Sequence, residues 1–346
     1  NIYIYENKTK RYLVDPCTTV HKWGYDGISL VQFNDTTYKF NSPNNYIYCS
    51  NATEIMLDSL MNDRLMSSNI SVESLTKPDI TAIQGVPGCG KSTWILNNHT
   101  LGKDLILCAT KEGINDIKSK IQMQVAKNKV GFKNLEKNYR TVASYLVNGN
   151  QKYDTVFIDE YMMIHAGYIG LVAELSQCKK MYLLGDKNQI PYIDRLHYVN
   201  MQFHDATKFV TKFDQHNITY RCPADVVFTL AHLYPNICTM NQNQRSVRLI
   251  TTTSVISATP IKENTLYLTF TKADKLTITS QVGLPPSSKV MTIHEAQGLT
   301  STVVVCVRLS TKPFQIFEST PHVIVAITRH TKSFIYVTPK IDLLAS

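Results

Sequence analysis

The chain has no uninterrupted apolar run that approaches the roughly 18 residues needed to cross a bilayer, so the sequence predicts no transmembrane segment. Low-complexity segments and short-period repeats are also missing, which excludes a solenoid. The eight cysteines are scattered, without a C-x-x-C pair or histidines at zinc spacing, so neither a disulfide framework nor a zinc site is indicated. We expect these cysteines to be reduced thiols in the core.

Charged residues make up only 18% of the chain, but their balance is basic, with a formal net charge of +9 and a pI near 9.0. This balance suits a polyanionic partner, with nucleic acid ahead of an acidic membrane surface. A solvated basic surface without a partner is the plain alternative. Lysines are concentrated in the segment 111–140, at Lys111, Lys118, Lys120, Lys127, Lys129, Lys133 and Lys137.

The length of 346 residues, of which 43% are hydrophobic, predicts a globular protein of more than one domain. Short aromatic and β-branched runs predict a small β-rich domain at residues 1–50, and helical spacing predicts a connecting helix and linker at residues 51–77. The chain begins with Asn1 instead of methionine, so we expect a fragment of a longer polypeptide.

From residue 78 onward, strand and helix patterns alternate, which favours an α/β fold with parallel sheets in two tandem domains. The expected domain bounds are residues 78–215 and 216–346. The expected strands are residues 80–83, 105–109, 155–158, 181–184, 247–251, 266–270, 290–293, 303–309, 322–327 and 334–337.

The loop GVPGCGKS at residues 85–92 fits the pattern G-x-x-x-x-G-K-S/T between a predicted strand and a helix expected over residues 93–97. In such a loop, backbone N–H groups and the helix N-terminus bind phosphates, the lysine adds charge and the serine is a Mg²⁺ ligand. The loop predicts a site for ATP or another nucleoside triphosphate with Mg²⁺; a glycine turn with an incidental lysine is the alternative. The residues expected at the nucleotide are Gly85, Val86, Pro87, Gly88, Cys89, Gly90, Lys91, Ser92 and Thr93.

Two carboxylates, Asp159 and Glu160, follow the apolar pattern TVFI. Downstream of a phosphate-binding loop this pattern is typical of a Walker B strand. Asp159 would then hold Mg²⁺ together with Ser92, and Glu160 would orient and deprotonate the attacking water. Taken alone, an acidic pair after a strand is equally often a turn.

Further segments give the chain a specific resemblance. GDKNQIP at residues 185–191, TYRCP at 219–223, MTIHEAQGLT at 291–300 and VAITRH at 325–330 resemble motifs III, IV, V and VI of superfamily 1 helicases, in that order. The residues of these motifs are similar to those in the replication proteins of alphavirus-like RNA viruses, above all the tobamovirus-like helicases. The resemblance covers residues 80–340 and implies two RecA-like P-loop domains, an accessory role for residues 1–75, and translocation from 5′ to 3′.

The resemblance also implies roles for single residues. Gln189 would sense the γ-phosphate, and Gln297 with Gly298 would close on the same phosphate. Guanidinium groups that reach a phosphoryl-transfer transition state from a second domain stabilise its charge, and Arg221 and Arg329 are the candidates, although isolated arginines are more often surface ion pairs. With Lys91, Asp159 and Glu160, these complete the expected catalytic set. RNA contacts are expected at Thr110, Lys111, Thr141, Ser144, Thr292, His294 and Thr300.

We therefore expect an NTP-dependent RNA helicase of a viral replication protein, which hydrolyses NTP between two RecA-like domains to move along and unwind RNA. An RNA 5′-triphosphatase that uses the same pocket is an additional activity to test. The alternative from another class is a nucleotide-gated scaffold that binds RNA or protein without unwinding. Expected partners are RNA and other parts of a viral replication complex, in the host-cell cytoplasm at membrane-associated complexes.

Overall fold

The structure is a computed structural model that describes short strands between residues 2 and 40, together with residues 78–127, 135–149, 151–164, 166–193 and 210–346. The N-terminal strands pair antiparallel, β1 with β2, and β4 with both β3 and β5. They are β1 (Ile2–Glu6), β2 (Arg11–Asp15), β3 (Thr19–Val20), β4 (Ser29–Phe33) and β5 (Thr36–Phe40). These strands agree with the β-rich pattern predicted there, whereas the helix predicted within residues 51–77 lies outside the described residues.

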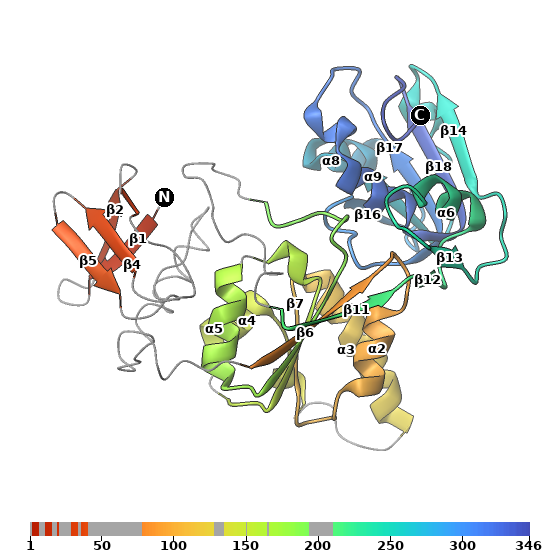
Figure 1. Cartoon of the computed structure of the whole chain (residues 1–346). Coiled ribbons are helices and arrows are strands. Elements are labelled where there is room, and N and C mark those ends of the chain that lie inside the picture. The colour runs from red at the N-terminus through yellow and green to blue at the C-terminus, as the bar shows by residue number, and fades with distance from the viewer. Residues whose placement is uncertain are drawn as a thin grey trace.

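Two parallel sheets form the core of the remaining chain (Figure 1). The first has the order β11-β6-β10-β9-β7-β8. Its strands are β6 (Asp79–Gly85), β7 (Leu105–Cys108), β8 (Tyr139–Thr141), β9 (Thr155–Asp159), β10 (Lys180–Gly185) and β11 (Lys212–His216). Its helices are α2 (Lys91–Asn98), α3 (Lys111–Lys127), α4 (Val142–Asn148) and α5 (Ala166–Ser176), with 3₁₀ turns η3 (Glu136–Asn138) and η4 (Tyr161–Met163).

The first sheet is covered on both faces, with α2 and α3 on one side and α4 and α5 on the other (Figure 1). Alternate residues of β6 point to these two layers, as the pleat of a strand requires. Ile80 and Ala82 pack in the cluster that includes α4 and α5, whereas Ile83 packs with Ile95 of α2 and Ile114 of α3. Because all the strands are parallel, their carboxyl ends meet at one edge, where the loop 85–92 leaves β6.

The second sheet has the order β14-β18-β17-β15-β16 and is also parallel throughout. Its strands are β14 (Val247–Thr251), β15 (Thr265–Thr269), β16 (Lys289–Thr292), β17 (Ser301–Val307) and β18 (His330–Thr338). Its helices are α6 (Ala224–Leu230), α7 (Val255–Ala258), α8 (Lys272–Gln281) and α9 (Thr320–Ile327), with the 3₁₀ turn η6 (Gln315–Glu318). Residues of α6 and α9 pack against one face, and residues of α7 and α8 pack against the other.

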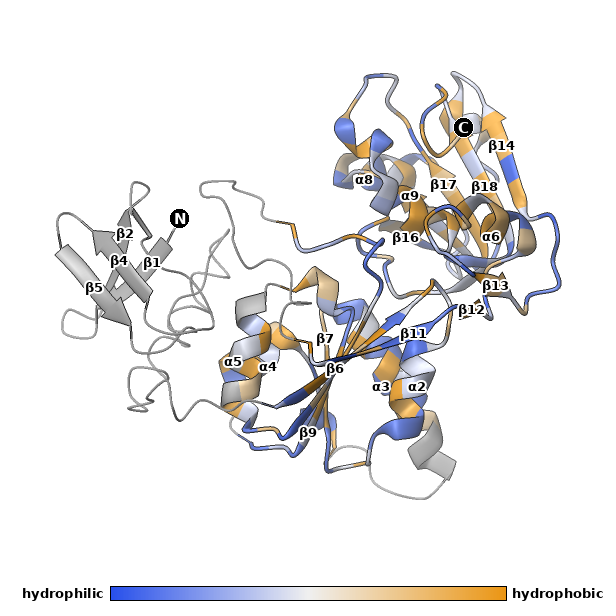
Figure 2. Cartoon of the chain, in the orientation of Figure 1, coloured by the Kyte–Doolittle hydropathy of each residue, from blue (hydrophilic) through white to orange (hydrophobic). Residues whose placement is uncertain are grey.

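The strand predicted over residues 322–327 is wrong, because this segment is the helix α9. Its last four residues are apolar and buried, and an apolar run that is buried all round has no periodicity that distinguishes a strand from a helix. Pro321 lies in the first helical turn, where its missing N–H has no intrahelical partner to lose. Figure 2 shows β17 and α9 as largely apolar elements.

Two strands of the first sheet, β8 and β11, were not predicted. β11 has an exposed, mostly polar sequence, KFDQH, which gives no alternation to detect. It pairs with β6 up to His216, and the short parallel pair of β12 (Ile218–Thr219) and β13 (Cys238–Thr239) follows it. The predicted domain boundary at residues 215 and 216 therefore falls at the end of β11, and the bounds themselves stay a prediction.

The cysteine prediction needs one correction. Cys89, Cys108, Cys178, Cys222 and Cys306 are free and buried as expected, but Cys238 is exposed because β13 lies at the surface.

In the described part of the chain, no helix combines the length and the apolar character required to cross a membrane.

Candidate nucleotide site

The loop 85–92 has the backbone that a phosphate cradle needs. Gly88 and Gly90 have φ angles of 76° and 90°, in the left-handed region that favours glycine. A side chain at Gly88 would also collide with the second α/β unit, because an added Cβ would lie 2.6 Å from Cβ of Arg221. The glycines therefore allow both the turn itself and the close approach of the two units.

The side chains of the loop face the carboxylates that end β9. Ser92 Oγ donates a hydrogen bond to Asp159 Oδ2 at 3.2 Å, and Lys91 Nζ donates to Gly85 O at 2.9 Å. Burial, together with the neighbouring charge of Glu160, raises the pKa of Asp159 to about 7. A buried carboxylate of this kind is stabilised by a cation, and with the Ser92 hydroxyl it supplies the oxygen ligands that Mg²⁺ prefers.

Glu160 adopts an unusual backbone conformation, with a φ angle of 54°. Such a conformation costs of order 1–3 kcal/mol in a residue with a side chain, and it persists only where surrounding contacts hold it. Glu160 is 6% exposed, and its carboxylate oxygen Oε2 accepts a hydrogen bond from Gln297 Nε2 at 3.0 Å. The base predicted from the first unit is thus held by an amide of the second.

The predicted sensor Gln189 is also part of a contact between the units. Its Nε2 donates to Asp186 Oδ2 at 2.8 Å, and the same oxygen accepts a hydrogen bond from Tyr234 of the second unit at 2.8 Å. Burial raises the pKa of Asp186. Asn188 Nδ2 donates to Leu233 O at 3.0 Å. The role of Tyr234 was not predicted, because it follows TYRCP outside any recognisable motif.

The segment TYRCP packs directly on the phosphate loop. Thr219 Oγ1 donates to Pro87 O at 2.7 Å, and the N–H of Tyr220 donates to Gly88 O at 2.9 Å. This places Arg221 at the loop, where its Nη1 donates to Thr300 Oγ1 at 2.9 Å and to Leu299 O at 3.2 Å.

Arg329 lies beside Arg221 and is 1% exposed. Its Nε donates to Val325 O at 3.0 Å, and its Nη1 donates to Leu299 O at 3.3 Å. Burial, followed by the neighbouring charge of Arg221, lowers the pKa of Arg329 to about 9, so the guanidinium is still charged at neutral pH. Two close, buried cations repel each other, and an anion between them would relieve this repulsion.

These residues line one cavity of about 640 Å³ between the two units. Of the predicted residues it contains Gly88, Cys89, Gly90, Lys91, Ser92, Thr93, Asp159, Glu160, Gln189, Arg221, Gly298 and Arg329. Gly85, Val86, Pro87 and Gln297 are not among the described residues of the lining, although Gln297 contacts the lining residue Glu160. Residues of the lining that were not predicted are Trp94, Asn97, Lys120, His216, Tyr220 and Thr331, together with Thr300, for which an RNA contact was predicted.

Atoms without hydrogen-bond partners show what the cavity is suited to hold. Within the described ranges, Gln189 Oε1, Arg221 Nε and Gln297 Oε1 are buried and unpaired. Buried polar groups of this kind indicate an unfilled site. With a glycine cradle, a lysine, a Ser–Asp pair and two arginines around them, the cavity fits a triphosphate with Mg²⁺.

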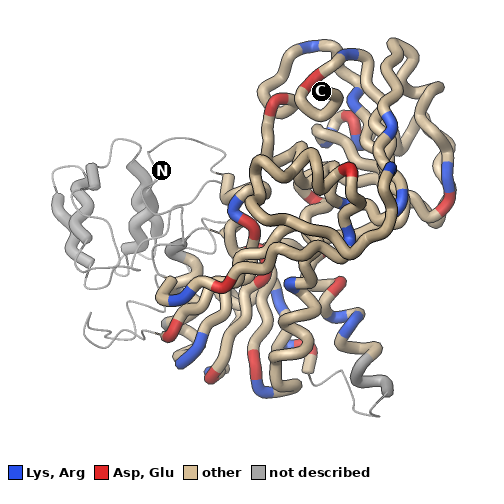
Figure 3. Tube along the Cα trace, turned by 45° about the vertical axis from the view of Figure 1, so that its right-hand side comes forward, with Lys and Arg blue, Asp and Glu red and all other residues tan. Residues whose placement is uncertain are grey.

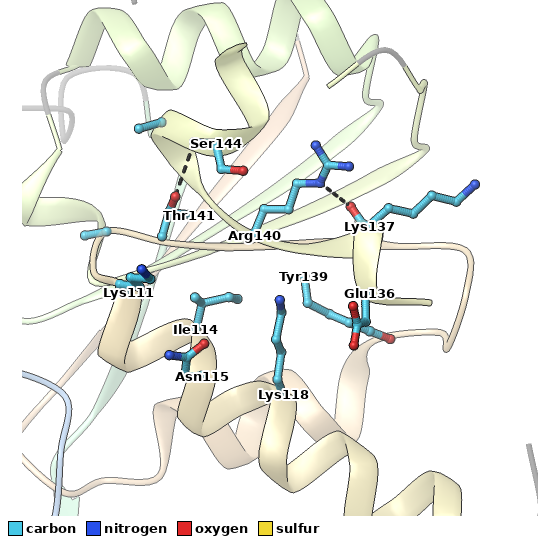
Figure 4. A pocket seen from close by; sticks show the side chains of 12 residues that line it. Lys111, Ile114, Asn115, Lys118, Glu136, Lys137, Tyr139, Arg140, Thr141 and Ser144 are labelled. Atoms are coloured by element: carbon cyan, nitrogen blue, oxygen red, sulfur yellow. Dashed lines mark hydrogen bonds between the residues drawn. The ribbon is translucent and has the colours of Figure 1, made fainter. Parts of the chain in front are cut away.

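The predicted RNA contacts do not form one set. Lys111, Thr141 and Ser144 line a separate groove of about 950 Å³ on the first unit (Figure 4). Thr110 lies next to it, where its Oγ1 accepts the N–H of Gly113 at 3.0 Å.

The remaining predicted contacts lie on the second unit. Thr300 faces the nucleotide cavity. Thr292 is buried, and its hydroxyl accepts the N–H of Glu295 at 3.2 Å. His294 is half-buried beside this turn. The hydroxyl of Thr292 is therefore used within its own loop, so the geometry favours a structural role there.

Residues 81–338 match the viral superfamily 1 RNA helicase core domain. The chain is 33% identical over 308 residues to the replicase large subunit of Soil-borne wheat mosaic virus, an alignment that covers 83% of this chain and 16% of that protein. It is 30% identical over 361 residues to the replicase large subunit of Tobamovirus Ob, covering 99% of this chain and 22% of that protein. The chain thus spans about a fifth of the length of these relatives.

Solved structures share the fold. An arterivirus nonstructural protein 10 helicase superposes with a TM-score of 0.55 at 15% identity, over 99% of this chain and 77% of that one. A complex of the arterivirus helicase with DNA gives a TM-score of 0.54 at 17% identity, over 80% of this chain and 65% of that one.

Proposed function

The chain belongs to the viral superfamily 1 RNA helicases, and we propose that it hydrolyses a nucleoside triphosphate between its two α/β units to move along and unwind RNA. The observation that carries the proposal is that both units contribute catalytic groups to one cavity. Lys91, Asp159 and Glu160 come from the first unit, and Arg221 and Arg329 come from the second.

Each group has a task in phosphoryl transfer. The loop N–H groups and Lys91 bind the β- and γ-phosphates, and Glu160 accepts a proton from the attacking water. Mg²⁺, when held by Ser92 and Asp159, neutralises charge on the phosphate oxygens. Arg221 and Arg329 stabilise the charge that spreads over the γ-oxygens in the transition state.

Gln297 positions both the base and its water. Its Nε2 is bonded to Glu160, and its unpaired Oε1 belongs to the same amide. A water that donates one hydrogen to Glu160 can donate its other hydrogen to this oxygen. Because Gln297 belongs to the second unit, Glu160 is oriented for catalysis only when the two units are closed.

Because the catalytic groups are divided between the two units, hydrolysis can be coupled to movement along RNA. A nucleotide that contacts both units stabilises their closed arrangement, and hydrolysis removes part of that stabilisation. A strand of RNA bound across both units would then be moved by alternate closure and opening.

The first test compares Lys91→Ala and Glu160→Gln with Lys103→Ala, an exposed lysine outside the cavity. We expect Lys91→Ala to lose nucleotide binding. Glu160→Gln should keep binding but lose about 10²- to 10⁴-fold in RNA-stimulated phosphate release, the usual contribution of a general base. RNA-stimulated hydrolysis that survives Lys91→Ala would refute the proposal.

Unwinding needs its own measurement, on a duplex RNA with a single-stranded tail. Nucleotide-dependent strand separation is expected. Hydrolysis without strand separation would instead favour the nucleotide-gated scaffold. The hydrogen bond between Glu160 and Gln297 argues against a scaffold, because binding without catalysis does not require an oriented base.

The same groups would remove the γ-phosphate from the 5′ end of a triphosphorylated RNA, because they all act at the phosphate end of the cavity. Phosphate released from such an RNA, and lost in Glu160→Gln, would support this second activity. No release would exclude it.

The relatives are replicase subunits, so we place this activity in a viral replication complex in the host-cell cytoplasm, at membranes reached through partner proteins. Co-purification of the chain with replicase components from infected cells, and its location by immunofluorescence, would test this placement.

A further inference from the structure

The groove on the first unit contains cations beyond the predicted RNA contacts. Besides Lys111, Thr141 and Ser144, it is lined by Lys118, Lys137 and Arg140 (Figure 4). These three residues belong to no helicase motif recognised in the sequence. Lys and Arg are interspersed with Asp and Glu over both units (Figure 3), so net charge alone does not distinguish this surface.

The cations come from both walls of the groove. Lys111, Asn115 and Lys118 follow one another at i, i+4 and i+7 on α3, and therefore lie along one face of the helix. Lys137 of η3 and Arg140 of β8 lie on the opposite side of the groove (Figure 4). A ligand in the groove would meet positive charge on both sides.

Among the described residues, these cations have no ion-pair partner. In the parts of the chain that are described, none of Lys111, Lys118, Lys137 and Arg140 forms an ion pair, whereas Lys120 on the same helix is paired with Asp116 at 2.5 Å. Glu136 is the one acidic residue among the described residues that line the groove. Unpaired like charges around a cavity repel each other, and a polyanion would remove this repulsion.

Arg140 is also oriented in advance. Its Nε donates to Lys137 O at 2.9 Å, which fixes the guanidinium and leaves both Nη groups for a ligand. A planar fork held in this way suits the oxygens of a phosphate. Arg140 and Lys137 also line an adjoining cavity of about 210 Å³, with Gln151 and Tyr153.

We propose that Lys118, Lys137 and Arg140 bind backbone phosphates of single-stranded RNA and extend the RNA path along α3, beyond Lys111, Thr141 and Ser144. The inference rests on the proposed function, because it names the continuation of that RNA path. Cationic side chains that bind backbone phosphates carry no sequence information, so we expect this binding to be independent of sequence and sensitive to salt.

The test combines Lys118→Gln, Lys137→Gln and Arg140→Gln in one variant of the full chain. The matched control removes three other lysines of the first unit with Lys152→Gln, Lys179→Gln and Lys180→Gln. Lys152 and Lys179 precede β9 and β10, and Lys180 is the first residue of β10, so all three lie at the amino-terminal edge of the sheet. Lys179 has only an exposed pair with Asp154. Affinity for a labelled single-stranded RNA is measured by fluorescence anisotropy over a range of salt concentrations.

Each phosphate contact to a single strand contributes about 0.7 to the slope of log K against log salt, so the triple variant should lose about 2 from this slope. The control should keep the wild-type slope, and RNA-free hydrolysis should be unchanged in both. A triple variant with the wild-type slope would overturn the proposal. So would one that loses affinity for blunt duplex RNA but keeps its affinity for single strands.

Single substitutions guard against misfolding. Lys118→Gln and Lys137→Gln remove no described side-chain hydrogen bond, and each should lower the slope by about 0.7. Failure of the proposed function gives a different result: RNA-stimulated hydrolysis would then survive Lys91→Ala. The salt slope of RNA binding does not depend on that result and tests the groove alone.

Discussion

The nucleotide cavity and the basic groove both suit phosphates, but they are built differently. In the cavity, Glu160, Arg221 and Arg329 are buried, come from both units, and are each held by hydrogen bonds to neighbouring groups. In the groove, Lys118, Lys137 and Arg140 come from the first unit and are half-buried or exposed. We therefore expect hydrolysis in the cavity to depend on the exact position of each side chain, whereas RNA affinity in the groove depends on the number of positive charges.

A substitution that keeps charge but changes geometry separates these two designs most strongly. Arg221→Lys should lower kcat by about 10³-fold, the lower end of the contribution of an arginine to phosphoryl transfer, because lysine lacks the planar fork. Affinity for a fluorescent nucleotide should change much less. Steady-state hydrolysis and nucleotide titration measure the two effects, with Arg248→Lys, on the exposed face of β14, as the control.

The corresponding change in the groove, Arg140→Lys, should leave the salt slope of RNA binding unchanged. An equal loss of hydrolysis in Arg221→Lys and Arg248→Lys, or a reduced salt slope in Arg140→Lys, would show that the distinction is wrong.

The contact between the units at Glu160 should have the next largest effect. Gln297→Ala removes the hydrogen bond to the base, and we expect kcat to fall about 10²-fold with little change in KM for ATP. Gln297→Glu places a second carboxylate against Glu160 and should displace the pH profile of kcat to higher pH, because like charges raise each other's pKa. Gln281→Ala, at the exposed end of α8, is the matched control. A pH profile that stays unchanged in Gln297→Glu would argue against this positioning.

A smaller effect concerns the support of the cavity. His330 follows Arg329, is fully buried, and is within 2.8 Å of Ser246 Oγ. Burial lowers the pKa of His330 to about 4 from its ordinary value of 6.5. The unfolded chain therefore binds a proton that the folded chain does not between these values, so stability falls as the pH drops from 6.5 to 4.

The shift of the His330 pKa corresponds to about 3 kcal/mol of unfolding free energy between pH 7 and pH 4. His330→Gln should remove this part of the acid sensitivity, as measured by denaturant unfolding at both pH values. The half-buried His322, whose pKa burial also lowers to about 4, would keep its own share. His232→Gln, at an exposed histidine, is the control and should not change the pH dependence of the unfolding free energy. An unchanged pH dependence in His330→Gln would contradict the proposed role of His330 in acid sensitivity.

Local pattern alone determined the phosphate loop, the two carboxylates and most strands of both sheets. The loop is contiguous, and its glycines are needed for the left-handed turns at Gly88 and Gly90, so its signal lies within one stretch of sequence. Asp159 is the last residue of a strand whose apolar run is buried on both faces, and Glu160 follows it. In such cases the residues that decide the structure are neighbours in the chain.

Only the tertiary structure decided which side chains meet. Glu160 and Gln297 are 137 positions apart, Asp186 and Tyr234 are 48 apart, and no local pattern records either pairing. The same holds for Thr300, which lies in the nucleotide cavity, and for Lys118 and Arg140, which face one groove from separate elements. The helix α9 shows the limit in another way, because a segment buried on every side has no polar face from which its period can be read. The local sequence pattern specifies a helix or strand and the motif it carries. Which side chains form the site is specified by the order of the parallel strands and by the packing of one unit on the other.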